Sequence, residues 1–329
     1  MSLRLVLYAA WATGLALFVG LIVYQGLGDI LTVLATAGWG LGWVIAFHLV
    51  PFVADVIGWR ALLPGAHRCS LIELSWMRWI GESINSLLPV AQVGGDLVRA
   101  RLLRRSGVPG GAAGASVIVD VTAGVMMLIP FALLGVGLLL QEGGTARAAA
   151  ELGFGIAIIA IVIASFYLAQ RAGVFLACAR AIEKLAKGRE WCSLTGGAAA
   201  LDAKVAAIYA RPMAVSFACG WRLIAWLLGA GEVWLALYFL GHPVTLTDAL
   251  ILESLGQAIR TAAFVIPGAL GVQEGGFVVL GGMLGLPPET SLAVSLVKRV
   301  RELALGLPSL IAWQIVEGRR AWHRQAPEA

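Results

Sequence analysis

The stretch Ile266-Pro267-Gly268-Ala269-Leu270-Gly271-Val272-Gln273-Glu274-Gly275-Gly276 lies at the centre of an apolar segment that runs from Thr247 to Trp313. Charged side chains flank this stretch, and each would cost roughly 2.5–3.5 kcal/mol inside a bilayer, so such charges indicate a functional site. A proline and glycine break beside them indicates a discontinuous helix that lines a polar cavity. We therefore interpret the segment as one half of a transport site, with the other half earlier in the chain. The charges are Arg260, Glu274, Lys298, Arg299, Arg301 and Glu302.

The composition of the chain is that of a membrane protein. Hydrophobic residues make up 60% of the 329 residues and charged residues 13%, whereas a soluble domain carries about 25% charged residues. The net charge of +5 comes largely from basic residues in short loops between apolar runs, which is the topology signal of a polytopic membrane protein. No basic module with interleaved aromatic residues is present, so we expect no nucleic-acid partner.

The sequence carries no recognisable catalytic or cofactor motif. The four cysteines and four histidines are scattered and match neither disulfide nor metal-ligand spacing. A phosphate loop and a nucleophile elbow are also missing. We therefore expect no metal, no cofactor and no enzymatic activity.

The apolar runs predict an all-α polytopic membrane protein with a single transmembrane domain over residues 1–329. Two elements, Leu71–Arg105 and Thr247–Gly285, contain a proline break and are predicted to be re-entrant, entering and leaving on one side of the membrane. About six helices are expected to cross fully: Leu5–Tyr24, Trp39–Trp59, Ala112–Leu140, Leu152–Leu168, Met213–Leu240 and Glu289–Val316.

The basic residues predict the orientation of these helices. Segment 171–211 is interpreted as an amphipathic connector on the cytoplasmic surface, and segment 318–329 as a basic cytoplasmic tail. With both segments in the cytoplasm, the positive-inside rule is satisfied over all six crossings. Both termini are therefore predicted to be cytoplasmic.

When the first half of the sequence is moved along the chain by one constant number of residues, three of its prolines superpose on prolines of the second half. We expect two repeats, at about 38–140 and 213–317. An odd number of crossings separates their starts, so the second repeat is predicted to be inverted in the membrane, an arrangement that is common among secondary transporters. The superposed pairs are Pro89 with Pro267, Pro109 with Pro287, Pro130 with Pro308, and Asp96 with Glu274.

Over residues 5–317 the chain resembles the flippase-like membrane region of lysylphosphatidylglycerol synthases and their stand-alone relatives. In the first half the resemblance rests on the run from Leu88 to Asp96, followed by Arg99 and Val119-Asp120. In the second half it rests on Ile266-Pro267-Gly268, Gly271-Val272-Gln273-Glu274 and Leu296-Val297-Lys298-Arg299. The runs from Gly81 to Pro89 and from Gly94 to Arg101 resemble the branch associated with hopanoid biosynthesis.

The resemblance implies a lipid-handling protein of the bacterial inner membrane, with lipid flipping as the activity attributed to the family. Membrane lipids are the implied partners, together with enzymes of lipid biosynthesis; the oligomeric state is left open. The aminoacyl-transferase domain of the full synthases is missing from this sequence, so lysyl transfer is not implied. Relatives carry Asp-Arg where this chain has Asp120-Val121.

Substrate contacts are expected from polar residues in both broken elements. Arg78, Glu82 and Asn85 are spaced i, i+4 and i+7 on one helix face, which predicts either a cavity lining or an interfacial face that lipid headgroups wet. In the second half, the basic residues would suit a lipid phosphate; alternatively, they form internal salt bridges with Glu253, Glu274 and Glu302. The full set comprises Arg78, Glu82, Asn85, Gln92, Arg260, Gln273, Lys298, Arg299 and Arg301.

Acidic residues are expected to serve as counter-charges or proton carriers. Asp96 and Glu274 follow their prolines at the same interval; alternatively, each carboxylate only stabilises the N-terminus of a half-helix. The predicted set comprises Asp96, Asp120, Glu232, Glu274 and Glu302. Its basic counterpart suggests a site that is acidic in the first half and basic in the second.

The favoured hypothesis is a transporter that moves a polar or anionic lipid headgroup through this site while the acyl tails stay in the bilayer. Two alternatives stay open at this point. One is an intramembrane enzyme that modifies lipids, and the other is a non-transporting partner that scaffolds a lipid-biosynthetic enzyme.

Overall fold

The computed structural model describes residues 35–65, 69–88, 93–141, 164–174, 192–263 and 266–325, together with single positions between 32 and 177. The predicted first helix, Leu5–Tyr24, eight of the 17 residues of the predicted fourth helix, and Gln92 lie outside the described residues.

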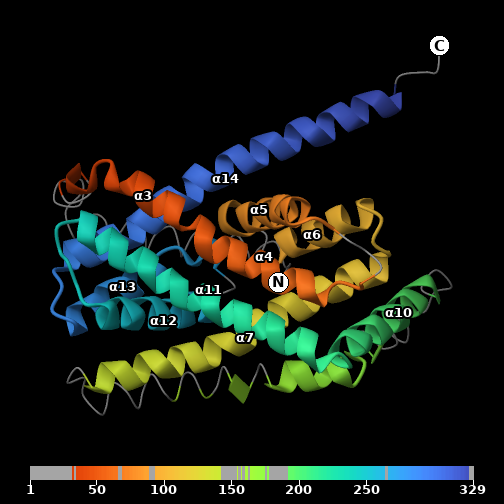
Figure 1. The fold of residues 1–329 in the computed structure, drawn as a ribbon, viewed down its shortest axis with the longest axis horizontal. Helices are drawn as coiled ribbons and strands as arrows, with labels where there is room; N and C mark the ends of the chain where they lie inside the picture. Colours follow the sequence, from red (N-terminus) through yellow and green to blue (C-terminus); the bar gives the residue numbers. More distant parts are fainter. Residues whose placement is uncertain are drawn as a thin grey trace, which may run out of the picture.

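Every regular element among the described residues is helical, so the described part of the chain is all-α. The elements follow the predicted segments closely, and Figure 1 shows how they are arranged. They are α3 (Gly40–Phe47), α4 (Leu49–Leu62), α5 (Leu71–Leu87), α6 (Gly94–Arg105), α7 (Gly110–Gln141), α10 (Cys192–Tyr209), α11 (Pro212–Phe239), α12 (Leu246–Ala262), the short 3₁₀ helix η2 (Pro267–Ala269), α13 (Val272–Met283) and α14 (Pro288–Gln325).

Three helical segments in the described part of the chain are long and apolar enough to cross a membrane. They are Gly40–Leu62, which joins α3 to α4, then α7 and α11. Helix α14 was also predicted to cross, but its charges at positions 298–302 keep it outside this composition-based group. The number of crossings and the re-entrant character of the broken elements therefore stay predictions.

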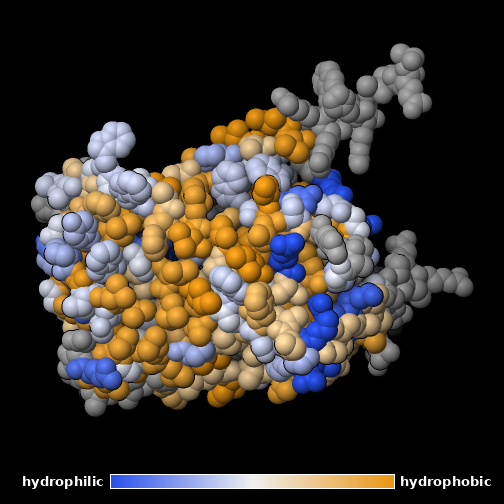
Figure 2. Space-filling model, viewed as in Figure 1, coloured by the Kyte–Doolittle hydropathy of each residue, from blue (hydrophilic) through white to orange (hydrophobic). Residues whose placement is uncertain are grey.

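The surface agrees with a membrane-embedded protein. Large apolar side chains are exposed along the long helices, for example Leu133 and Leu134 on α7 and Leu307 and Ile311 on α14. Figure 2 shows hydrophobic residues over the middle of the visible face. Soluble monomers rarely expose contiguous apolar patches of this kind, because water makes them costly.

The first arms of the two broken elements are built alike. Helices α5 and α12 each contain 17 residues, and each begins with a capping box, Ser70 with Glu73 and Thr245 with Asp248. In such a box the hydroxyl and the carboxylate satisfy backbone N–H groups that the first helical turn leaves free. The second arms, α6 and α13, contain 12 residues each.

The offset between the two halves changes within the broken element. The shift that superposes Pro89 on Pro267 also superposes the first residues of α6 and α7 on those of α13 and α14. The same shift would start α12 at Ala249, yet this helix begins three positions earlier, at Leu246. The second break is longer by that amount, and it contains η2 with two consecutive positive φ angles, 62° at Gly268 and 50° at Ala269. The second arms and the long helices that follow them thus start at matching positions in the two halves.

Corresponding helices of the two halves run in opposite directions. In Figure 1, α7 runs from right to left and α14 from left to right, while the α3–α4 pair and α11 are likewise antiparallel. Opposite chain directions are what an inverted repeat requires.

Each broken element packs on its own hydrophobic cluster. One cluster gathers mainly residues of α4, α5, α6 and α7, including Trp59 and Leu103, and the other gathers residues of α11, α12, α13 and α14, including Leu255 and Phe277, together with part of α7. The two halves meet along several helix pairs, among them α4 with α11, α7 with α12 and α5 with α14. In the last pair the Trp79 indole N–H donates to the Leu305 carbonyl at 2.9 Å. Charged side chains converge between the two clusters.

Candidate functional site

A cavity of about 690 Å³ lies between the two halves of the molecule. Its wall is drawn from α4, α5, α11, α12 and α14, with His48 at the α3–α4 junction. Aromatic side chains such as Phe52, Trp76, Trp79 and Trp226 alternate in this wall with charged ones. The charged wall residues are Asp55, Arg78, Glu82, Arg222, Glu232, Glu253, Arg260, Arg301 and Glu302.

The first charge network is centred on Asp120 of α7, which is almost completely buried. Its carboxylate accepts from three guanidinium groups: Arg99 Nη2 at 2.6 Å, Arg78 Nη1 at 3.2 Å and Arg222 Nη2 at 3.4 Å. These arginines come from α6, α5 and α11. Asp120 therefore ties three helices together, and Asp55, Glu82 and Asp96 complete this network.

Asp55 of α4 connects the first network to the cavity. Its Oδ2 accepts from Arg222 Nη1 at 2.6 Å and from Arg78 Nη2 at 2.9 Å, while its buried Oδ1 has no hydrogen-bond partner among the described residues. Arg78 Nε also donates to Glu82 one turn along α5, at 2.7 Å. Arg78, Glu82 and Asn85 all lie in the cavity wall, which agrees with the predicted polar face of α5.

Arg99 differs from the other three arginines of α6. Arg101, Arg104 and Arg105 are exposed. Arg99 is only 4% exposed and bonds to Asp96 at 3.0 Å and to Asp120. Its position on α6 turns it inward onto the Trp59 ring, 4.2 Å from the centroid.

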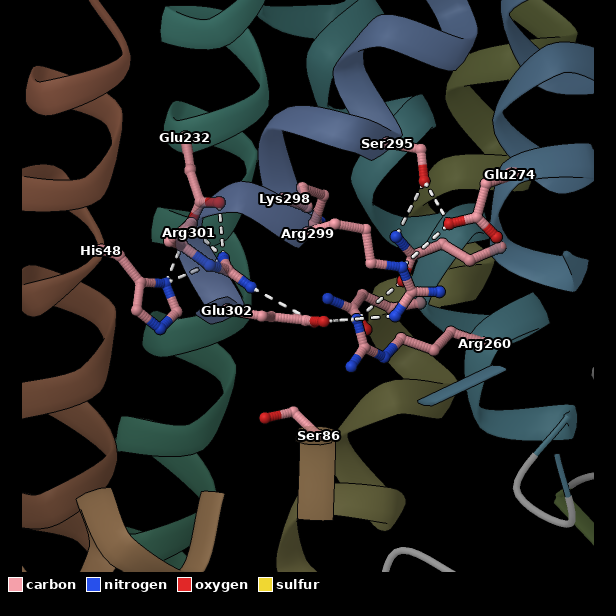
Figure 3. A network of polar contacts seen from close by, with 12 residues as sticks. His48, Ser86, Glu232, Arg260, Glu274, Ser295, Lys298, Arg299, Arg301 and Glu302 are labelled. Atoms are coloured by element: carbon pink, nitrogen blue, oxygen red, sulfur yellow. Dashed lines mark hydrogen bonds and ion pairs between the residues drawn. The ribbon is translucent and has the colours of Figure 1, made fainter. Parts of the chain in front are cut away.

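The second charge network is centred on Glu302 of α14 (Figure 3). Its carboxylate accepts from Arg260 Nη1 at 2.6 Å and from Arg299 Nη1 at 3.2 Å, and Arg301 Nη2 lies 3.7 Å away. Arg260 also donates to Gln273 at 2.7 Å. The network comprises His48, Glu232, Glu253, Arg260, Glu274, Lys298, Arg299, Arg301 and Glu302.

At one end of this network, Glu232 of α11 joins α14 to α4. Arg301 Nη1 donates to both carboxylate oxygens of Glu232, at 2.6 Å for Oε2. His48 Nδ1 lies 2.8 Å from the same Oε2. Arg222, ten residues earlier on α11, likewise pairs across helices, with Asp55 of α4.

At the other end, Glu274 and Glu253 each hold one basic residue of α14. Glu274 accepts from Arg299 Nε at 2.9 Å and also from the backbone N–H of Gly271 at 2.7 Å, as a half-helix cap would. Glu253 of α12 pairs with Lys298, whose ammonium group also lies 5.4 Å from the centre of the Phe277 ring.

These contacts match the salt-bridge alternative for the basic residues of α14. Each of Lys298, Arg299 and Arg301 has at least one carboxylate partner. The second network therefore contains four basic and four acidic residues besides His48, so the expected basic excess in the second half is wrong. The charges of the second network balance because α11 and α12 bring Glu232 and Glu253 to the basic residues of α14.

The predicted site residues divide into those in the wall and those behind it. Behind the wall lie the polar residues Asp96, Asp120, Gln273, Glu274, Lys298 and Arg299, each of which contacts another residue of the two networks. The wall holds Arg78, Glu82, Asn85, Glu232, Arg260, Arg301 and Glu302.

Three wall residues, His48, Asp55 and Arg222, were missed by the sequence analysis. His48 and Asp55 lie in the predicted second crossing, Trp39–Trp59, where every other residue is uncharged. A single carboxylate in such a run is costly and needs a partner, so the rule that selected Asp120 also applied to Asp55.

A family model described as the lysylphosphatidylglycerol synthase TM region matches residues 11–308 of the chain. In the same comparisons no curated protein and no solved structure matched.

Proposed function

The chain belongs to the family of lysylphosphatidylglycerol synthase transmembrane regions, and on this basis we propose that it moves lipids with a polar or anionic headgroup across the bilayer. The observation that carries the proposal is a cavity that connects the two buried charge networks. Family membership makes the chain an integral membrane protein related to lipid handling.

The size and lining of the cavity fit a headgroup. A volume of about 690 Å³ lies within the range of roughly 300–1,000 Å³ that small-molecule sites occupy, and it is too small for a headgroup together with two long acyl chains. Phe52, Trp76, Trp79 and Trp226 offer apolar surface beside the charges. A headgroup could therefore cross through the cavity while its tails stay in the lipid.

The ion pairs of the wall suggest how an anionic headgroup is held. Arg260 and Arg301 bond to Glu302 and Glu232, and removal of one partner from a buried pair costs about 3–5 kcal/mol. A lipid phosphate can replace a carboxylate because it accepts the same bidentate contact from arginine. The arginines would exchange carboxylate for phosphate, so release of the helices that they join depends on the ligand.

The inverted arrangement of the two halves supplies the accompanying movement. In the proposal the two broken elements alternate in opening the cavity toward opposite sides of a bacterial inner membrane, with both termini in the cytoplasm. Corresponding antiparallel helices and equal arm lengths support this inversion. Wall carboxylates serve as counter-charges that keep the empty cavity compact.

The proposal includes three further points. We propose that the chain belongs to the hopanoid-associated branch, that it has no enzymatic activity, and that its partners are enzymes of lipid biosynthesis. Lipid mass spectrometry after overexpression tests the enzymatic alternative, since a new lipid product would contradict transport alone.

The direct test is reconstitution into liposomes that contain fluorescent phosphatidylglycerol. The full chain should accelerate the movement of this lipid between leaflets, measured by quenching of the outer leaflet. Arg260→Ala should slow the movement roughly tenfold or more, because a hydrogen bond to a charged group contributes about 1.5–3 kcal/mol.

The matched control is Arg104→Ala, which removes an exposed arginine that lies outside the cavity wall. It should leave the rate of lipid movement unchanged. A wild-type protein that accelerates none of an anionic, a zwitterionic and a cationic lipid would overturn the proposed function.

A further inference from the structure

The cavity wall carries one more negative than positive charge among the described residues. Four arginines face five carboxylates there. Counted by network, the second network is balanced without His48, and the surplus belongs to the first network, in which Arg78, Arg99 and Arg222 face Asp55, Glu82, Asp96 and Asp120. Asp55 and Glu82 of the first network line the cavity, so the surplus borders the space where a ligand would enter. An uncompensated charge in a low-dielectric cavity is costly, so the wall is poised to accept one positive charge.

His48 is the wall residue that can supply this charge. Its Nδ1 lies 2.8 Å from Glu232 Oε2, and since a carboxylate only accepts, Nδ1 carries the hydrogen of that bond. Arg301 Nη1, 3.0 Å from Nδ1, is also a donor, so both groups share Glu232 as acceptor. The lone pair of the neutral ring is then on Nε2.

The Nε2 atom is accessible from the cavity. The imidazole is 23% exposed and belongs to the cavity wall. In Figure 3 its second nitrogen points away from Glu232 and Arg301, and no described residue bonds to it. The lone pair of this atom can accept a proton without breaking the Glu232 contact.

We propose that His48 Nε2 is the binding site for a proton that crosses together with an anionic headgroup. The inference rests on the proposed function and names its coupling ion. The proton forms an N–H bond at Nε2 on one side of the membrane and leaves from the same atom on the other side, so the lipid monoanion and the proton cross as a neutral pair.

The linkage follows from the charged groups of the wall that holds the ring. Glu232 on α11 and Arg301 on α14 contact the ring, and the same wall carries Glu302 on α14, Glu253 on α12 and Asp55 on α4. Lys298 of α14 lies behind the wall, paired with Glu253. An anionic headgroup adds a second uncompensated negative charge to this wall and so favours the protonated imidazolium. By reciprocity, protonation of His48 strengthens the binding of the headgroup by the same factor.

The test uses proteoliposomes with fluorescent phosphatidylglycerol, an imposed pH difference and a membrane potential clamped at zero. For one proton per lipid, a difference of one pH unit should drive roughly a tenfold ratio of the lipid between leaflets, since tenfold corresponds to about 1.4 kcal/mol. An ionophore that dissipates the gradient should return the ratio to one.

The variant His48→Gln, which keeps a polar amide but does not titrate, should give a ratio of one at every gradient. His242→Gln is the matched control, because His242 lies in the turn after α11 and outside the cavity wall. It should keep the full tenfold response. A persistent response in His48→Gln would overturn the assignment of the proton to this residue.

The wild-type protein provides an independent readout if His48→Gln does not fold. A pH-sensitive dye inside the vesicles should report proton entry when the lipid is added outside. Lipid movement that ignores the pH difference and carries no protons would overturn the coupling and leave the proposed function intact. No lipid movement under any gradient would instead overturn the proposed function itself.

Discussion

The Arg78–Asp120 pair of the first half and the Glu253–Lys298 pair of the second half occupy corresponding places with reversed charges. Arg78 lies eight residues after the capping serine of α5, and Glu253 lies eight residues after the capping threonine of α12. Their partners lie at matching positions of α7 and α14. Both pairs join a first arm to the long helix that follows, at 3.2 Å for Arg78 and Asp120.

The reversal shows that the pairing at this junction, and not the sign of either charge, is what the two halves share. The surroundings differ more. Asp120 accepts from three arginines, whereas Lys298 has a single carboxylate partner among the described residues and an aromatic ring. Where Arg99 crosses Gly81 in the first half, Phe277 crosses Gly256 in the second. The first junction is thus more polar and should be the less tolerant of substitution.

The largest expected effect is the loss of the carboxylate at the centre of the first network. Asp120→Ala would leave Arg78, Arg99 and Arg222 close together without their shared acceptor. We expect the free energy of unfolding to fall by about 5 kcal/mol, the upper end for a broken buried ion pair. Unfolding in detergent against denaturant measures this change. Glu289→Ala, at the start of α14, is the control and should cost less than about 1 kcal/mol.

Disruption of the Glu253–Lys298 pair should lower the free energy of unfolding by a smaller amount, and a second substitution should restore part of it. Lys298→Glu alone would put two carboxylates together and should cost about 3–5 kcal/mol. The double variant Glu253→Lys with Lys298→Glu, which copies the polarity of the first half, should recover at least half of that loss. A double-mutant cycle measures the coupling; zero recovery would show that the sign of the charge is fixed by Phe277 and Gln257.

Glycine-to-alanine substitutions should cost different amounts of stability where the two arms of each broken element cross. A Cβ on Gly95 would lie 1.9 Å from the Gly81 carbonyl oxygen, whereas the corresponding position of the second half is occupied by Gln273. Gly95→Ala should therefore cost about 1–3 kcal/mol of stability.

Gly256→Ala should cost less, because its Cβ would first meet the Phe277 ring at 3.3 Å. Gly220→Ala on α11 has open space around it and should be neutral or slightly stabilising. Thermal unfolding of the three variants gives the order. A Gly95→Ala protein as stable as Gly220→Ala would contradict the close crossing in the first half.

The smallest expected effect concerns the capping boxes, which are alike in the two halves. Ser70→Ala and Thr245→Ala each remove the hydroxyl of one capping box and should each cost about 1 kcal/mol. Denaturant unfolding should give two similar values. A difference of more than about 1 kcal/mol would mean that the first turns of α5 and α12 are not equivalent.

The elements were predictable because their signals are local. Apolar runs gave α7 and α11 to within two residues at each end, and the prolines marked both breaks. The constant shift that superposes Pro89 on Pro267 was less accurate, because it does not hold for α5 and α12. The constant shift does not show that the second break is longer near Gly268. It therefore places Arg78 and Glu253 out of register. Their correspondence could not be found from residue identity either, because the two side chains carry opposite charges.

The sequence by itself determined the membrane class, the family, the order and length of the helices, and the fact that most of the buried charges matter. Those properties follow from hydropathy, helix breaks and the cost of charge in lipid, which act on neighbouring residues. Only the tertiary structure decided which charges meet. Ion pairs such as Arg222 with Asp55 or Arg301 with Glu232 join positions far apart in the chain, and their choice depends on how helices pack. The same packing turned Arg99 inward, balanced the second network and left His48 facing the cavity.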